Sequence, residues 1–207
     1  MSPRPYNLGR RQAQIDQARR QILDAARALL GEASRYTQFS VEVVAKRADV
    51  ARATVYYQFG SKTGLLEALC DDLAEAGQMS ELAQVFTNPE PEVALSGFVA
   101  CFGRFWDADR VVMRRLRALA ALDPDVGAVI AARDQRRREG LAVLVERIKK
   151  GAGLPPTTDP DRVVGILHAL TSFETFDALA PANEPLAAAI PDIVGLAQAA
   201  LRIATPP

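Results

Sequence analysis

The stretch FSVEVVAKRADVARATVYYQF, residues 39–59, decides the fold of the first third of the chain. Ser40 is a good N-cap, because its hydroxyl can accept a hydrogen bond from a free amide of the first helical turn. Asp49 suits a turn, since aspartate tolerates the left-handed conformation better than most residues. The pattern therefore predicts two short helices, near 41–48 and 51–59, joined as a helix-turn-helix.

The second of these helices carries more outward-facing polar side chains than its own packing explains. Those predicted to point outward are Arg52, Thr54, Tyr56, Tyr57 and Gln58. Arginine can read guanine and glutamine can read adenine, while tyrosine and threonine hydroxyls can bond phosphate. Lys62 begins the next helix, where free amides, the helix dipole and an ammonium together attract a phosphate. The pattern favours a DNA-binding surface, and the alternative is an ordinary helical corner with partly buried tyrosines.

Charge is distributed unevenly along a chain of 207 residues whose formal net charge is zero. Residues 1–62 hold 11 Lys or Arg and five Asp or Glu, a net charge of +6, and the remainder carries −6. A basic end on an otherwise acidic protein indicates a local polyanionic partner. The alternative is a surface that is simply rich in arginine.

Several function classes are excluded by composition and motif. One histidine and two cysteines leave no histidine-rich metal site and no disulfide framework. The chain has no nucleophile elbow, no metal-ligand cluster and no dinucleotide fingerprint. We therefore expect that the protein is not an enzyme and binds neither a cofactor nor a metal ion. The longest uncharged stretches, 93–103 and 163–173, are too short to span a bilayer. We expect a cytoplasmic protein that does not enter a membrane.

Helical periodicity continues through the rest of the chain, and strand alternation is scarce. The expected longer helices cover 11–31, a segment starting at Ser61, 92–106, 124–150, 159–179 and 184–203. The charged run 133–139 is interpreted as a solvated helix face. The predicted fold class is all-α.

Residues 12–73 resemble the N-terminal domain of TetR-family transcriptional regulators. The resemblance rests on the run TVYYQFGSK at 54–62, on Leu65 and Leu66 after it, and on matching positions within 44–50. It implies a three-helix helix-turn-helix domain, residues 1–62, followed by a larger helical ligand-binding and dimerisation domain, residues 63–207. Asp49 departs from the family pattern, which usually has glycine there.

The resemblance also implies roles for single residues of the first domain. The DNA-contacting set is Ser40, Arg52, Thr54, Tyr56, Tyr57, Gln58 and Lys62. Arg52 falls at a variable, base-reading position, while Tyr57 and Lys62 fall at positions that usually hold phosphates. Gln58 replaces a more usual histidine or aromatic residue, so it could hold a phosphate or read a base.

In the second domain the resemblance is architectural. Aromatic and apolar residues of the middle helices are candidates for a ligand pocket, although each is also an ordinary core residue: Leu69, Phe98, Phe102, Phe105, Trp106, Met113, His168, Thr171 and Phe176. The family usually dimerises through its last two long helices. The apolar residues expected at that interface are Leu167, Leu186, Ile190, Val194, Ala197 and Leu201.

These inferences together predict a homodimeric, ligand-responsive regulator. Its partners would be a double-stranded DNA operator and a small, mostly apolar ligand. We expect repression relieved by that ligand, and activation is the alternative mode. The alternative is a TetR-like, DNA-anchored interaction protein without ligand-controlled release.

Overall fold

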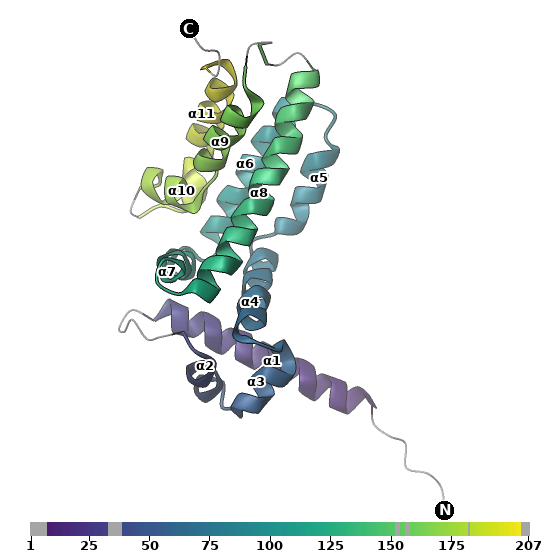
Figure 1. Ribbon diagram of the computed structural model, residues 1–207, viewed down its shortest axis with the longest axis vertical. Coiled ribbons are helices and arrows are strands. Elements are labelled where there is room, and N and C mark those ends of the chain that lie inside the picture. The colour runs from purple at the N-terminus through teal and green to yellow at the C-terminus, as the bar shows by residue number, and fades with distance from the viewer. Residues whose placement is uncertain (1–7, 33–38, 152–153, 156–157, 182, 204–207) are drawn as a thin grey trace, which may run out of the picture.

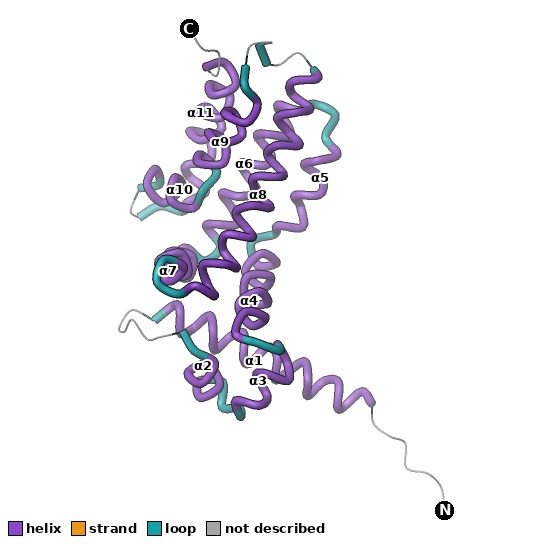
Figure 2. Tube along the Cα trace, in the orientation of Figure 1, coloured by secondary structure: helices purple, strands orange, loops and turns teal. Residues whose placement is uncertain are grey.

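The computed structural model describes residues 8–32, 39–151, 154–155, 158–181 and 183–203, and all its regular structure within these ranges is helical (Figure 1, Figure 2). The all-α fold expected from the sequence is confirmed. No helix in these ranges is both long and apolar enough to cross a membrane.

Four helices make the base of the molecule: α1 (Leu8–Gly31), α2 (Val41–Arg47), α3 (Arg52–Phe59) and the start of α4 (Lys62–Ala76). Helix α1 packs across α2 and α3, and α4 leads upward from them (Figure 1). The apolar side chains at threefold and fourfold spacing on α1 are buried in this contact, among them Ile22. We call α1–α3 with the first turn of α4 the reading head.

The upper part begins with a short 3-10 helix, η1 (Met79–Glu81), and α5 (Leu82–Thr87), which the sequence did not predict. Then follow α6 (Pro91–Asp107), α7 (Arg110–Ala120) and α8 (Pro124–Lys150). Helix α6 contacts α5, α8 and the last helix of the chain, which explains why it is apolar nearly all round. Helix α7 crosses below the bundle, next to α1 (Figure 1).

The chain ends in α9 (Pro160–Leu170), α10 (Phe173–Leu179), η2 (Leu186–Ala189) and α11 (Ile190–Ile203). We call α5–α11, with both 3-10 helices, the effector domain, after the ligand-binding role expected from the sequence. The predicted division of the chain at residue 62 falls where α4 begins, and it stays a prediction.

Two of the expected helices, 159–179 and 184–203, are each interrupted. The first ends at Leu170 and restarts because the Ser172 hydroxyl accepts the Thr175 amide at 3.2 Å, which caps a new helix. The second begins as a 3-10 turn before α11. Gly103 of α6 lies so close to Ile190 that an added Cβ would stand 2.5 Å from its Cγ1 atom. Only glycine allows this approach of the two segments.

Candidate nucleic-acid interface

The turn between α2 and α3 is fixed by local interactions. The Ser40 hydroxyl accepts a hydrogen bond from the Val43 amide at 3.3 Å and caps α2. Asp49 takes the left-handed conformation, with φ of 53°. The Val50 amide then donates to the Ala45 carbonyl at 3.0 Å and closes the turn. The predicted helix-turn-helix is confirmed, with aspartate in place of the usual glycine.

Helix α3 buries one side and presents the other to solvent. Val55 is 1% exposed and anchors the helix, whereas Tyr57 is 72% and Tyr56 38% exposed. Arg52 is exposed as well, and Thr54 is half-buried. The structure thus places five of the predicted DNA-contacting residues, these four and Gln58, on one short helix at the base of the molecule.

Arg52 is held in place by two neighbours. One guanidinium nitrogen lies 2.8 Å from the Glu42 carboxylate of α2, and another donates to the Tyr56 hydroxyl at 3.0 Å. The hydroxyl of Tyr56 and the charge of Glu42 both raise the pKa of the Arg52 guanidinium. Because an arginine has five N–H donors in a rigid fork, it keeps free donors for a base edge while its direction is set.

Gln58 points toward α1 and away from the exposed tyrosines. Its side-chain amide donates to the backbone carbonyl of Ile15 at 3.1 Å. The Arg19 guanidinium lies 4.6 Å from the ring centroid of Phe59, next along α3. The sequence could not reveal these contacts, because they depend on how α1 crosses α3.

Lys62 is also engaged. Its ammonium lies 2.5 Å from a carboxylate oxygen of Asp123 and 3.4 Å from one of Asp125, at the start of α8. Partial burial opposes the charge, yet the two carboxylates together raise the pKa of Lys62. Its hydrogen bond in turn lowers the pKa of Asp123. The predicted phosphate contact of Lys62 has not been tested, and in this structure its ammonium faces two acids.

Comparison with known families identifies this segment. Residues 22–69 match the family described as bacterial regulatory proteins, tetR family. The segment is a TetR-family helix-turn-helix domain. The match covers the end of α1, both helices of the motif and the first half of α4. No curated protein matches the chain.

Solved structures extend the likeness to the whole fold. A TetR transcription regulator from Haloarcula marismortui is 16% identical and has a TM-score of 0.66, over 90% of this chain and 97% of that chain. A TetR-family regulator from Rhodococcus sp. is 16% identical, with a TM-score of 0.68 over 88% and 99%. A transcriptional regulator from Saccharomonospora viridis, solved in complex with choline, is 18% identical. It has a TM-score of 0.61 over 87% of this chain and 96% of that chain. The chain therefore has the fold of these regulators over about nine tenths of its length.

The aromatic residues expected to line a pocket pack against each other in the effector domain of this TetR-like chain. The rings of Phe98 and Phe102 lie 4.8 Å apart and those of Phe105 and Trp106 4.5 Å apart, between centroids. The Trp106 indole donates to the Thr171 carbonyl at 3.0 Å. The other candidates are buried or half-buried: Leu69, Met113, His168 and Phe176. Their role in ligand binding stays a prediction.

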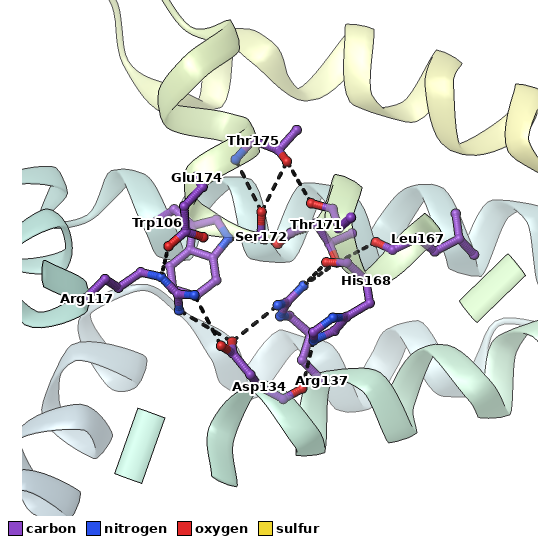
Figure 3. A network of polar contacts seen from close by, with 11 residues as sticks. Trp106, Arg117, Asp134, Arg137, Leu167, His168, Thr171, Ser172, Glu174 and Thr175 are labelled. Carbon is purple, nitrogen blue, oxygen red and sulfur yellow. Dashed lines mark hydrogen bonds and ion pairs between the residues drawn. The ribbon is translucent and has the colours of Figure 1, made fainter. Parts of the chain in front are cut away.

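A buried arginine stands beside this cluster (Figure 3). Arg137 is 4% exposed and donates to the Thr171 hydroxyl at 2.8 Å and to the His168 carbonyl at 2.5 Å. Burial lowers the pKa of its guanidinium. The interpretation of residues 133–139 as a solvated face is therefore wrong at this position, because α9 covers that side of α8.

Arg117 of α7 completes the network. It pairs with Asp134 at 3.2 Å and with Glu174, and its guanidinium carbon lies 6.0 Å from the Trp106 ring centroid (Figure 3). Burial works against the charge of Asp134, yet Arg117 and Arg137 lower the pKa of its carboxyl. The network ties α7, α8, α9 and α10 together around the aromatic cluster.

A cleft of about 380 Å³ opens between α7 and α10. Its lining is mostly charged, includes one aromatic residue, and consists of Arg114, Arg117, Ala118, Phe173, Glu174, Asp177 and Ala178. None of these is among the predicted pocket residues. Sequence reasoning missed the cleft because its charges come from two helices that are far apart in the chain.

Most of the residues expected at a dimer interface are used inside the protomer. Leu167, Leu186, Ala197 and Leu201 are buried, and Ile190 packs on Gly103, because α11 and η2 lie against α6 and α9. Val194 is half-buried. The exposed sides of α9 and α11 carry other apolar residues, including Leu196 at 47% exposure. A single apolar stripe does not distinguish a core contact from an interface.

Proposed function

We propose that this chain is a homodimeric transcriptional repressor that binds a double-stranded operator and leaves it when the effector domain binds a small molecule. The observation that carries the proposal is the exposed side of α3, where Arg52, Tyr56 and Tyr57 stand on a TetR-family helix-turn-helix. Helices of this kind enter the major groove, one from each protomer of a dimer. Such a regulator would act in the cytoplasm, and we propose no enzymatic role.

The proposed dimer surface is the outer side of α9 and α11. Leu196 is exposed there, Ala169 is exposed, and Ile166 is half-buried. Gly165 and Gly195 lie on the same two helices, and a Cβ added to either would meet nothing within 4 Å. Glycine inside a helix costs about 1 kcal/mol relative to alanine, and the protomer gives no reason for that cost. Close approach of a second copy would supply one.

For the ligand we propose the cleft between α7 and α10. Paired arginines and acids around Phe173 favour a molecule with a polar or charged group and an apolar part. This differs from the mostly apolar ligand expected from the sequence. The complex of the S. viridis regulator with choline supports small-molecule binding by proteins of this fold.

Operator selection from random DNA tests the proposal, with the full-length protein and a gel shift on the selected sequence. We expect a site of two related half-sites, bound by a dimer. A library of small amphipathic ions is then added to the complex. Release by one of them supports a ligand-controlled repressor. Binding that none of them changes favours the DNA-anchored interaction protein, and no selected sequence at all contradicts both.

A further inference from the structure

Two helices of the effector domain begin at aspartates that have the same double role. In Asp109, which caps α7, one carboxylate oxygen accepts the Val112 amide at 3.2 Å. The other oxygen accepts a hydrogen bond from the Arg27 guanidinium of α1 at 2.7 Å. One oxygen therefore caps the start of α7, and the other binds a basic side chain of the reading head.

Asp123 repeats this arrangement at the start of α8. One oxygen accepts the amides of Asp125 at 3.1 Å and Val126 at 3.4 Å. The other lies 2.5 Å from the ammonium of Lys62, at the start of α4. Neither role disturbs the other, because each uses its own oxygen atom.

Not every capping aspartate of this chain has such a partner. Asp159 caps α9 by accepting the Asp161 amide at 3.0 Å, and it forms no ion pair within the described ranges. The two aspartates that contact a basic side chain, Asp109 and Asp123, are those whose helices border the reading head. All four charged side chains of the two pairs are partly shielded from solvent, so salt screens the pairs less than surface pairs.

The two pairs hold the reading head at separate points. Arg27 comes from the second half of α1, and Lys62 follows directly after α3 and its turn. A further contact supports the first point: the Arg115 guanidinium of α7 donates to the Leu30 carbonyl of α1 at 2.7 Å. Two separate points of attachment prevent the reading head from shifting and leave it only rotation about the line that joins them. These contacts therefore restrict the angle between α3 and the effector domain.

We propose that Asp109 and Asp123 are positioning residues for DNA recognition, which set the separation of the two recognition helices in the dimer and hence the operator spacing that the protein accepts. This inference rests on the proposed function. It assigns Lys62 to positioning instead of phosphate binding. It also gives a ligand a route to the DNA, because movement of α7 or α8 moves the aspartate at its start.

The test replaces each aspartate by asparagine. Asparagine caps helices as well as aspartate does but carries no charge, so Asp109→Asn and Asp123→Asn remove the Arg27–Asp109 and Lys62–Asp123 pairs and keep the caps. The longer pairs of Arg27 with Asp72, at 3.9 Å, and of Lys62 with Asp125, at 3.4 Å, are left in place. Asp159→Asn is the matched control, because it changes a capping aspartate that forms no ion pair in the part of the chain that the structure describes. Circular dichroism and thermal unfolding of each variant, compared with this control, will establish that the variants fold alike.

The readout is binding of the full-length protein to selected operators whose half-site spacing is changed by single base pairs. Each base pair rotates one half-site by about 34° about the DNA axis. The wild-type protein and Asp159→Asn should prefer one spacing sharply. The double variant Asp109→Asn/Asp123→Asn should bind that spacing about tenfold more weakly and accept neighbouring spacings almost equally. An unchanged spacing profile in the double variant would overturn the inference while leaving the repressor proposal intact.

Lys62→Gln resolves what the lysine does. If it acts through its two acids, adding Lys62→Gln to Asp123→Asn/Asp125→Asn changes nothing further, as a mutant cycle would show. Tighter DNA binding by Asp123→Asn alone would mean that the acid withholds Lys62 from a phosphate, and this would overturn the positioning role. A wild-type protein that binds no DNA at any spacing would contradict the proposed function itself, and the inference with it.

Discussion

The side-chain amide of Gln58 reaches across to α1 and donates to the backbone carbonyl of Ile15, 3.1 Å away. A carbonyl inside a helix has a second lone pair, so Ile15 can accept this bond without losing its helical one. The Arg19 guanidinium of α1 donates in return to the backbone carbonyl of Gln58 at 3.4 Å. These two contacts join the C-terminal end of α3, next to Gly60, to α1.

Gln58→Ala should therefore act on the fold more than on the choice of base. We expect the free energy of unfolding to fall by about 0.5–1.5 kcal/mol, since one partly buried hydrogen bond is lost. Urea titration measures this change. Gln12→Ala is the control, because the Gln12 amide donates to Asp16 on the exposed side of the same helix. Its loss removes a hydrogen bond that does not join α1 to α3. If Gln58→Ala instead changes affinity at one operator position alone, the glutamine reads a base.

Arg52→Ala should relax specificity at a single base position. The loss there should be about 1–3 kcal/mol, because Glu42 and Tyr56 already direct the guanidinium. Tyr57→Phe removes a hydroxyl expected to bond phosphate and should weaken all operators alike. Gel shifts on a series of operators with single changes compare the two variants. Equal losses for Arg52→Ala on every operator would exclude base reading by that arginine.

The sequence predicted those features that depend on neighbouring residues. The cap at Ser40 and the left-handed turn at Asp49 both follow from local chemistry, and the structure confirms them. The family resemblance added the DNA-contacting roles expected of residues on α3, but not the protein side chains that these residues contact.

The remainder depended on contacts between distant segments. Arg137 lies in a run of charges that favours a solvated face, yet α9 covers it. Lys62 lies at a helix start that attracts anions, and the anions it contacts are Asp123 and Asp125, about sixty residues later in the chain. Leu186 belongs to an apolar stripe that serves the core of the protomer. Periodicity shows which residues avoid water, but not which surface covers them.

Leu196→Glu should separate the dimer without harming the protomer. Leu196 is 47% exposed, so the glutamate remains solvated in the monomer, but in the dimer it would be desolvated without a partner. Light scattering should show monomers, and operator affinity should fall because the two half-sites are no longer bound together. Val143→Glu on α8 is the control, at 51% exposure, and should stay dimeric. A dimeric Leu196→Glu would place the interface elsewhere.

His168 should make the stability of the protein depend on pH in a known direction. Burial and the charge of Arg137 lower its pKa below the ordinary 6.5, although the backbone carbonyl of Asp134, 3.1 Å from Nε2, works the other way. The unfolded chain therefore takes up the proton at a higher pH than the folded one. By linkage, the free energy of unfolding should fall as the pH drops below about 6.5 and level off below the folded pKa.

The chain has one histidine, so its proton resonance can be followed alone during an NMR titration. Urea unfolding over the same pH range gives the stability. His168→Gln is the test variant, because an amide can still donate to the Asp134 carbonyl but does not titrate. This variant should abolish the change in the free energy of unfolding between pH 6.5 and the folded pKa of the histidine. The loss of stability at lower pH remains, because the folded protein lowers the carboxyl pKa of Asp134. A histidine resonance that titrates above 6.5 would show that the imidazolium is stabilised here, and stability would then rise on acidification through that pKa.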